Sequence, residues 1–561
     1  MKNNLGLVFG EGVHKGRKRA IHQDKEKYAR GYSLRLILTV VISVFLLGIL
    51  ITRLFELTII KGGYYRNLAS GNRIREKKIT APRGIIYDKD GKALVHNVPA
   101  GENEVTREYP YGETLAHLMG YIGEIDEEEM MRKNRNLSSH LAYKLGDFVG
   151  KTGIEKYYED KIRGIDGREL LEFDASGDMI RSLGRVEPRP GSNLHLSLSL
   201  PLQKIASSSM EGKTGAVIAS NPINGEILAF YSAPSFDPNA FIKGINIETI
   251  LEDKRLPLFD RVIGGVYPPG STFKIITSVA GLETKAVEAS TQYEDVGVLR
   301  VGEFSFPNWY FNQYGKKEGM VDMVKAIKRS NDIYFYKVGE KLGIDRLGAW
   351  ARRMGVGKTL GIDLEGEEAG VMPDDAWKRK VRGEQWYLGD TYHVAIGQGD
   401  LLTTPLQVNV WTNAIANGGK LCKPHLVGNQ KQDCKDLGIK KENIEVVRRG
   451  MIEACQPGGT GYPLFKFQIP NSKFQIDGRN FLETYESTTS AKKVTEIVTA
   501  CKTGTAEYGD PKNKTHAWFT IFAPAYDPQI SITVLVEGGG EGSSVAAPIA
   551  KKMLEEWFGV R

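Results

Sequence analysis

The stretch that decides the fold of this 561-residue chain reads Tyr267-Pro268-Pro269-Gly270-Ser271-Thr272-Phe273-Lys274. Proline and glycine before Ser271 interrupt regular structure, and the apolar spacing after it is helical. Ser271 is therefore predicted at or near a helix start, where free backbone N–H groups and the positive end of the dipole favour a developing anion. Lys274 lies three residues on, so a neutral lysine could be the base for a nucleophilic serine. Ser-x-x-Lys alone is common on surface helices and specifies nothing.

Two later motifs change that assessment. Ser330-Asn331-Asp332 precedes an apolar run, and Lys502-Thr503-Gly504-Thr505-Ala506 follows a β-prone stretch at 494–499. The order Ser-x-x-Lys, Ser-x-Asn/Asp, Lys-Thr-Gly is typical of penicillin-binding proteins and serine β-lactamases. With the surrounding segments at 259–270, 397–407, 516–519 and 546–548, the chain from residue 36 to its end resembles a class B penicillin-binding protein of the elongation type.

The resemblance implies a role for each motif residue. Ser271 would attack the carbonyl between two terminal D-alanines, Lys274 would take its proton, and Ser330 would relay a proton to the leaving D-alanine. The oxyanion would lie between the backbone N–H groups of Ser271 and Thr505. The terminal carboxylate would be held by Lys502, Thr503 and Thr505. Gly504 would let the substrate backbone approach the strand closely.

The third residue of the second motif departs from the family pattern. The family usually has Asn there, whereas this chain has Asp332, with the amide at Asn331. A carboxylate paired with Lys274 would raise the pKa of that lysine and weaken the base. We therefore expect Asp332 to pair with Lys502 or to accept from a substrate amide, leaving Lys274 free. The alternative is that Asp332 is only a solvated neighbour.

The N-terminal segment predicts a membrane anchor. Residues 1–35 carry nine Lys and Arg against three acidic residues, and the largely apolar run 36–60 is 25 residues long. This is enough to span a bilayer, and the positive-inside rule explains the basic tail better than nucleic-acid binding does. The alternative is a signal peptide, but no small-x-small cleavage site follows residue 60. We expect a single-pass protein of the bacterial inner membrane, with the N-terminus cytoplasmic and the catalytic domain outside.

Cysteines and metal ligands give further expectations. Cys422, Cys434, Cys455 and Cys501 permit two disulfides without requiring them. In the family, a helix near Cys455 packs beside the catalytic edge strand, so the resemblance implies a Cys455–Cys501 bond. The region 285–329 contains no Cys or His, so we predict no zinc site between the first two motifs and no cofactor.

The expected fold class is α+β, with an antiparallel sheet covered by helices. The Asn224-Gly225 turn predicts a hairpin within 215–229, strands are expected at 518–522 and 530–536, and a last helix at about 548–558. We expect a tail at 1–35, a transmembrane helix at 36–60, a pedestal at 61–193 and a transpeptidase domain at 194–561.

The pedestal lacks one part that the family usually has, and it contains a copy of a catalytic motif. The family's head lobe is expected to be missing, because Arg107 follows Asn97-Val98-Pro99 almost at once. Lys151-Thr152-Gly153 copies the third motif, but it precedes Ser271 and continues into a predicted pedestal helix. The sequence Gly146-x-x-x-Gly150-Lys151-Thr152 also suggests a phosphate loop, but such a loop needs four residues between its glycines and this stretch has three.

The function that the resemblance implies is D,D-transpeptidation during cell-wall elongation. The partners would be peptidoglycan stem peptides on lipid II-derived glycan strands, β-lactams, and a membrane-embedded SEDS-family glycan polymerase; no nucleic acid is expected. The alternatives are a division-type transpeptidase, a β-lactamase, or a β-lactam-binding scaffold for the polymerase. A bifunctional class A enzyme is disfavoured because no glycosyltransferase domain fits between residues 60 and 195.

Overall fold

The computed structural model describes residues 24–101, 104–135, 137–138, 141–174, 176–428, 430–462, 464, 468–470, 494–510 and 514–559. The chain forms two compact units. One comprises Met1–Lys78 with Arg168–Glu187, and the other Ile79–Gly167 with Pro188–Arg561. The domain bounds expected from the sequence stay a prediction.

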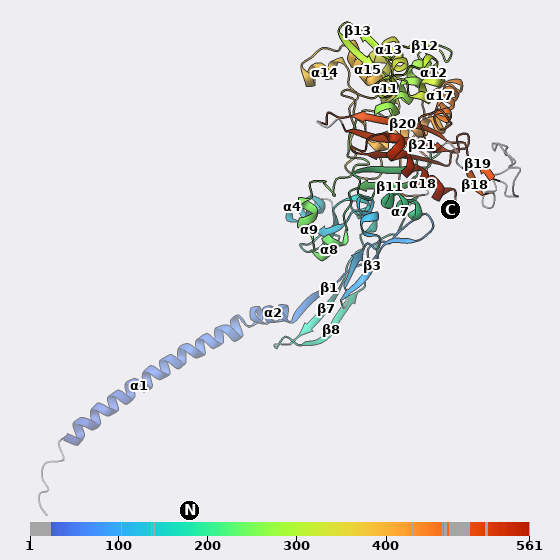
Figure 1. The fold of residues 1–561 in the computed structure, drawn as a ribbon. Coiled ribbons are helices and arrows are strands. Elements are labelled where there is room, and N and C mark those ends of the chain that lie inside the picture. The colour runs from blue at the N-terminus through green and yellow to red at the C-terminus, as the bar shows by residue number, and fades with distance from the viewer. Residues whose placement is uncertain are drawn as a thin grey trace, which may run out of the picture. The chain divides into compact units, whose positions relative to one another are not determined.

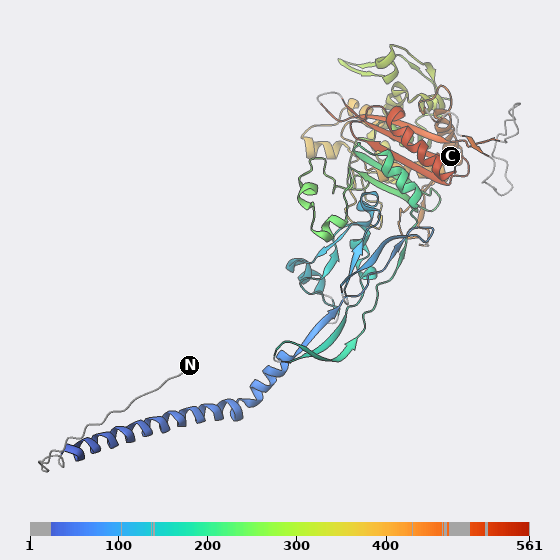
Figure 2. The same cartoon turned by 60° about the horizontal axis from the view of Figure 1, so that its bottom comes forward.

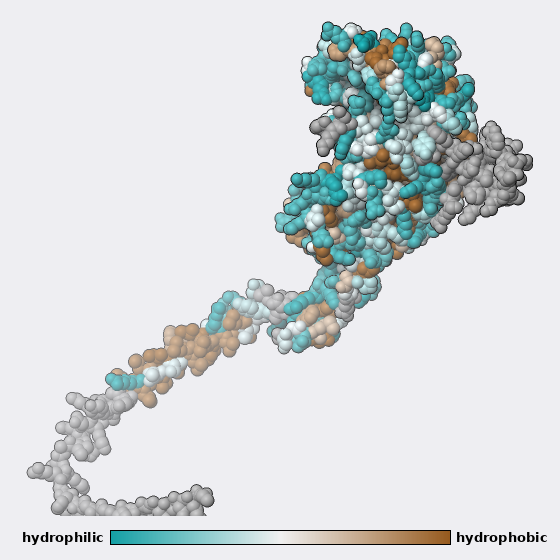
Figure 3. All heavy atoms as spheres, in the orientation of Figure 1, coloured by the Kyte–Doolittle hydropathy of each residue, from teal (hydrophilic) through white to brown (hydrophobic). Residues whose placement is uncertain are grey.

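The first unit contains the expected anchor. Helix α1 (Asp24–Phe55) continues through a π-helical turn, η1 (Glu56–Ile60), and α2 (Gly62–Arg73) follows. Leu34–Ile60 has a mean hydropathy of 2.8 and appears as the brown band along α1 (Figure 3). None of its most apolar window is buried. A three-stranded sheet in the order β1-β7-β8 completes the unit, formed by β1 (Ile74–Ile79), β7 (Gly167–Phe173) and β8 (Met179–Val186). An apolar, lipid-length helix with charged residues at its end fits the expected membrane span.

The second unit begins with a four-stranded sheet in the order β4-β3-β2-β9. Its strands are β2 (Ile86–Tyr87), β3 (Ala93–Gly101), β4 (Glu104–Glu108) and β9 (Leu194–His195). β3 and β4 pair antiparallel from His96↔Glu108 to Gly101↔Glu104, so the chain turns back where we expected the head lobe to be missing. Smaller elements follow: η2 (Gly112–Thr114), α3 (Ala116–Met119), β5 (Ile122–Glu124), α4 (Glu127–Asn134), β6 (Phe148–Gly150), α5 (Gly153–Tyr157) and α6 (Glu159–Ile162).

The copy of the third motif in this region is structural. Gly153 starts α5 with a positive φ, and a Cβ there would lie 2.4 Å from the backbone nitrogen of Gly120. The helix places Glu155 in a buried ion cluster, where it pairs with Arg83 and Arg107, each at 2.7 Å. Breaking such a pair leaves an uncompensated buried charge. The sequence-based interpretation as a pedestal helix start is therefore confirmed.

A five-stranded sheet forms the centre of the large domain, in the order β11-β10-β22-β21-β20. All neighbours are antiparallel. The sheet joins the green strands β10 and β11 to the red strands β20, β21 and β22, which come much later in the sequence (Figure 2). The strands are β10 (Gly215–Ser220), β11 (Ile227–Ala233), β20 (Ala500–Glu507), β21 (Thr515–Ala523) and β22 (Ile530–Val536). The predicted hairpin, the two later strands and the last helix, α18 (Ala547–Trp557), are all confirmed.

Helices cover both faces of this sheet (Figure 1). α7 (Leu200–Ser209) and α18 lie on one face, and α16 (Pro405–Ala416) packs on the other. The alternation of side chains along β21 divides the two cores, because Trp518 and Phe522 belong to one and Phe519 and Ile521 to the other. This two-sided burial makes the sheet a rigid support for its terminal strand, β20.

The remaining elements surround this support. They are α8 (Asn239–Lys243), α9 (Ile247–Glu252), η3 (Gly270–Phe273), α10 (Lys274–Glu283), β12 (Tyr293–Asp295), β13 (Val298–Val301), β14 (Phe304–Pro307), α11 (Trp309–Tyr314), β15 (Gly319–Val321), α12 (Met323–Arg329), α13 (Asp332–Arg353), α14 (Asp375–Arg382), α15 (Leu388–Ala395), β16 (Lys420–Cys422), β17 (Cys434–Asp436), α17 (Lys441–Ala454), β18 (Gln468–Pro470), β19 (Val494–Glu496) and η4 (Gly542–Ala546).

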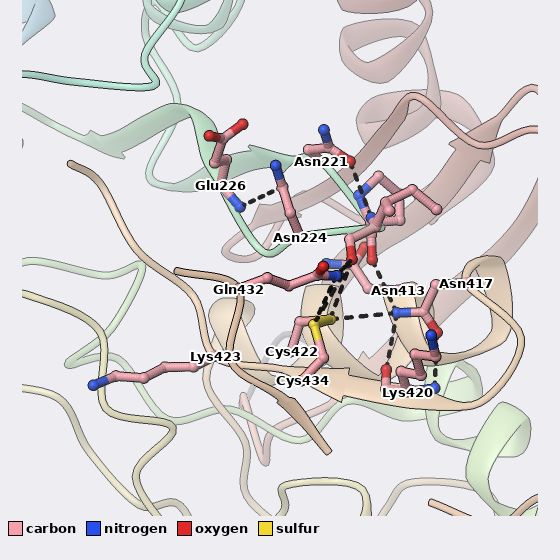
Figure 4. The surroundings of a disulfide bond; sticks show 12 residues. Asn221, Asn224, Glu226, Asn413, Asn417, Lys420, Cys422, Lys423, Gln432 and Cys434 are labelled. Atoms are coloured by element: carbon pink, nitrogen blue, oxygen red, sulfur yellow. Dashed lines mark hydrogen bonds between the residues drawn. A yellow bond between two sulfur atoms is a disulfide. The ribbon is translucent and has the colours of Figure 1, made fainter. Parts of the chain in front are cut away.

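Two disulfides constrain the large domain. Cys455, at the end of α17, bonds to Cys501 in β20, so the expected pairing is confirmed. The second bond, whose existence the sequence left open, joins Cys422 to Cys434 across the β16–β17 ladder. Gln432 covers it and donates a hydrogen bond of 2.6 Å to the backbone oxygen of Ile223 (Figure 4).

Candidate active site

Ser271 lies in the 3₁₀ turn η3, directly before α10, as the sequence predicts. Gly270 has φ +52°, and its N–H donates to the backbone oxygen of Gly397 at 2.9 Å. Trp518 donates from Nε1 to the oxygen of Pro268 at 2.9 Å. These contacts fix the backbone directly before a half-buried serine. Free N–H groups at such a turn can stabilise an anion.

Ser330 lies between the two lysines of the motifs. Lys274 Nζ is 3.3 Å from Ser330 Oγ, and Lys502 Nζ is 2.7 Å from the same oxygen. Lys274 also donates to the backbone oxygen of Ser330 at 2.7 Å. Both lysine residues are 0% exposed. A hydroxyl between two buried amines is placed to pass protons between them.

The expectation that Asp332 leaves Lys274 free is wrong. Asp332 Oδ1 accepts from Lys274 Nζ at 2.6 Å, whereas Lys502 bonds to Ser330 and to the oxygen of Thr503. The other carboxylate oxygen accepts from the backbone N–H of Trp309 at 2.8 Å. The reason is geometric, because Lys274 and Asp332 each begin a helix, and α10 and α13 pack against each other.

The loop holding Ser330 has an unusual backbone. Ser330 ends α12 with φ +52°, a left-handed conformation that is uncommon outside glycine. Asn331 then caps α13 by accepting from the N–H of Tyr334 at 2.9 Å, and its amide donates to Asp295 at 3.0 Å. As expected, the Asn331 side chain therefore points away from the lysines. Its structural contacts hold the strained serine in place.

The third motif lies on β20 as the terminal strand of the sheet. A Cβ on Gly504 would meet Thr272 Cγ2 at 3.0 Å and the oxygen of Pro269 at 3.1 Å, so only glycine lets the strand pack this closely on η3. Thr503 bonds to Thr460 through the two hydroxyls at 2.9 Å. Thr505 is exposed on the same face of the strand. The strand therefore presents hydroxyls beside the serine turn.

All three motifs line one cleft of about 1100 Å³. Its lining includes every predicted site residue except the two lysines, which lie beneath its floor: Ser271, Ser330, Asp332, Thr503, Gly504 and Thr505. A cleft of this size, with a few convergent polar groups, can hold an extended peptide of several residues.

Burial controls the charge of the two lysines. It lowers the pKa of Lys274, although the Asp332 carboxylate opposes the change. The pKa of Lys502 lies well below its usual range, first because of burial and then because of the Lys274 charge. Each lysine therefore accepts a proton less readily than an exposed one and is closer to the neutral state that a base requires.

Several residues of the site have no sequence signal. Trp309 and Asn308 hold Asp332 through backbone and side-chain hydrogen bonds, and Thr460 holds Thr503. They come from segments between the motifs and belong to no recognisable pattern. In the described part of the chain, no group of three or more His, Cys, Asp or Glu side chains could hold a metal ion.

Comparisons with known proteins agree with this architecture. The family model "Penicillin binding protein transpeptidase domain" matches residues 215–555, and the "Penicillin-binding Protein dimerisation domain" matches residues 100–196. The peptidoglycan D,D-transpeptidase MrdA of Acinetobacter baumannii is 35% identical over 82% of this chain and 66% of its own length. MrdA of Salmonella typhimurium is 30% identical over 91% of this chain and 93% of its own.

Solved structures show the same fold. Pseudomonas aeruginosa PBP2 in complex with WCK 5153 superposes with a TM-score of 0.71 at 34% identity, covering 86% of this chain and 96% of that one. The PBP2–MreC complex from Helicobacter pylori gives 0.71 at 28% identity, covering 86% and 98%. With its fold, its motif order and both domain matches in agreement, this chain belongs to the penicillin-binding protein transpeptidase family.

Proposed function

We propose that this chain is a peptidoglycan D,D-transpeptidase of the cell-elongation type that works through a serine acyl-enzyme at Ser271. The observation that carries the proposal is that Ser271 and Ser330 line one cleft while two buried lysines contact Ser330 from beneath it. The family, and relatives named as D,D-transpeptidases, support the same activity.

The first half-reaction forms the acyl-enzyme. Neutral Lys274 takes the hydroxyl proton as Ser271 Oγ attacks the carbonyl carbon between the two terminal D-alanines. The oxyanion accepts from the backbone N–H groups of Ser271 and Thr505. As the carbon–nitrogen bond breaks, Ser330 donates a proton to the departing amine and is reprotonated from Lys274. D-Alanine leaves, and its carboxylate is released from Lys502, Thr503 and Thr505.

The second half-reaction forms the cross-link. A neutral amine from a neighbouring stem peptide attacks the ester carbon of the acyl-enzyme. Its proton passes through Ser330 and Lys274 back to Ser271 Oγ as the ester bond breaks. Proton count and electron pairs balance without a metal or a redox cofactor. A β-lactam would acylate Ser271 in the same way but would leave slowly.

The anchor and the partners complete the proposal. The apolar helix and the basic tail before it support an orientation with the N-terminus in the cytoplasm and the catalytic domain outside the inner membrane. A solved relative is a complex with MreC, and another structure describes a peptidoglycan synthase complex that coordinates polymerisation and cross-linking. By analogy with these complexes, this chain would bind a membrane-embedded glycan polymerase of the SEDS type.

The test is covalent labelling. Membranes containing the full chain are treated with fluorescent penicillin, and the Ser271→Ala variant is the control. We expect one labelled band that the variant loses, with slow release of the label. Absence of label on the wild-type protein would refute the proposed acyl-enzyme and support a scaffold role without catalysis. Rapid turnover of a chromogenic cephalosporin would indicate a β-lactamase instead.

A further inference from the structure

The terminal strand β20 carries a buried lysine near its start and an exposed glutamate at its end. Lys502 lies near its start, Thr505 lies beside the serine turn, and Glu507 is its last residue. In the described part of the chain β20 pairs only with β21, so its other edge is available for an extended peptide. Antiparallel strand addition of this kind is a common mode of peptide recognition.

The catalytic groups set the direction of that peptide. Ser330 and Lys502, which serve the leaving group in the proposed reaction, bond to each other at the start of the motif. Gly270, beside Ser271, lies level with Thr505, because a Cβ on Gly270 would be 2.9 Å from the Thr505 oxygen. The leaving D-alanine therefore points toward Lys502. The remainder of the donor runs toward Glu507, antiparallel to β20.

Glu507 is the charged group at the upstream end. It lines the cleft and is exposed, on the same face of the strand as Thr503 and Thr505. No described residue forms an ion pair or hydrogen bond with its carboxylate. Other carboxylates of the cleft are occupied: Asp332 by Lys274, Asp400 by Arg382, and Glu541 by Gln313.

Among the described residues that line the cleft, the only permanent cation is Arg382, which pairs with Asp400. Burial first, then Asp332 and Glu507, raises the pKa of Tyr336. Burial lowers the pKa of His393, with Asp390 and Glu507 opposing it. Both rings line the cleft within the electrostatic reach of Glu507, and near neutral pH both are uncharged. The carboxylate therefore faces the space that a donor would fill.

We propose that Glu507 recognises a side-chain ammonium on the donor residue that precedes the D-alanyl-D-alanine end. Thr505 and Glu507 are about 7 Å apart along the strand, and the preceding donor residue begins about 3.4 Å upstream. A long side chain that ends in an ammonium spans the remaining distance to Glu507. A peptide with a cation upstream and a carboxylate at its end fits this strand in one direction only, with the cation at Glu507 and the carboxylate at the Lys502 end. This inference rests on the proposed function.

The test compares two donors that differ in one charge. They are Nα-acetyl-L-lysyl-D-alanyl-D-thiolactate and its norleucine analogue, and kcat/KM is measured from thiol release by the full-length protein. We expect the wild type to prefer the lysine donor by roughly fivefold, as for an exposed ion pair, with the preference falling at high salt. Glu507→Gln should bring the ratio to about one, and Glu507→Lys below one.

Glu541→Gln is the matched control. It removes one negative charge from the same cleft, while the new amide oxygen can still accept from Gln313. It should keep the wild-type ratio. Ampicillin and benzylpenicillin, which differ by one ammonium, give a second measure through their acylation rates. An unchanged ratio in Glu507→Gln, or an equal loss in Glu541→Gln, would overturn the inference. Absence of any penicillin adduct on the wild type would instead overturn the proposed function.

Discussion

Replacing Asp332 with Asn tests how the site controls its base. Each oxygen of the carboxylate accepts one hydrogen bond, Oδ1 from Lys274 Nζ at 2.6 Å and Oδ2 from the backbone N–H of Trp309 at 2.8 Å. An asparagine has one oxygen to accept and one amide group to donate. If the oxygen keeps the Trp309 bond, the amide faces Lys274, which can accept from it only when neutral. Asp332→Asn should therefore favour neutral Lys274.

The direction of the pKa change in Asp332→Asn follows from the two effects that act on Lys274 in the wild type. Burial lowers the pKa of Lys274, and Asp332 raises it. Removing the carboxylate leaves burial less opposed, so the pKa falls further and the base form persists to lower pH. One charge-assisted hydrogen bond contributes about 1.5–3 kcal/mol, and one pKa unit corresponds to about 1.4 kcal/mol. We expect the acid limb of the acylation profile to move down by at least about one pH unit.

Acylation rate and stability should distinguish Asp332→Asn from Asp332→Ala. Asp332→Asn should keep acylation within about tenfold of the wild type, because roughly 1.4 kcal/mol covers one lost hydrogen bond. Asp332→Ala should lose more, since Trp309 N–H and Lys274 both lose their acceptor. Its unfolding free energy should recover as pH rises, because the unfolded state then binds more protons than a folded state with a neutral lysine.

The assay is the second-order rate of acylation by fluorescent penicillin, measured from acid to alkaline pH, with thermal unfolding in parallel. Asp322→Asn is the control, because Asp322 caps α12 through the N–H of Lys325 and asparagine caps helices equally well. The reasoning is refuted if the acid limb of Asp332→Asn stays in place or moves up. Acylation of Asp332→Ala at the wild-type rate would show that Asp332 has no role in the site.

Three further outcomes are expected. Mass spectrometry after penicillin treatment should place the adduct on the peptide that contains Ser271, and an adduct elsewhere would exclude it as the nucleophile. Lys502→Met should abolish acylation yet raise the melting temperature, because the lysine is fully buried with a pKa held well below its usual range; an unchanged or lower melting temperature would contradict this. Reducing the Cys455–Cys501 bond, which closes a 46-residue separation, should cost about 4 kcal/mol in the loop-entropy account and slow acylation. Equal stability and rate for oxidised protein and a Cys455→Ala/Cys501→Ala variant would count against that role.

Much of this protein was determined by the sequence alone, because the deciding signals are local. Pro269 and Gly270 before a helical pattern predict Ser271 at a helix start, and the turn chemistry of Asn224-Gly225 predicts the β10–β11 hairpin. The anchor follows from a largely apolar run of 25 residues at 36–60. These features depend on propensity, spacing and turn conformation over a few residues, so they can be read without the fold.

Only the tertiary structure decided how the charges pair. Lys274, Asp332 and Lys502 are separated by up to 228 residues, and residue types alone allow Asp332 to pair with either lysine. Because α10 packs against α13, Asp332 pairs with Lys274, whereas β20 positions Lys502 beside Ser330. The same holds for Glu507 at the end of β20, whose carboxylate pairs with none of the described residues. Pairing in a buried site depends on distances of a few tenths of an ångström between segments that meet only when the chain has folded.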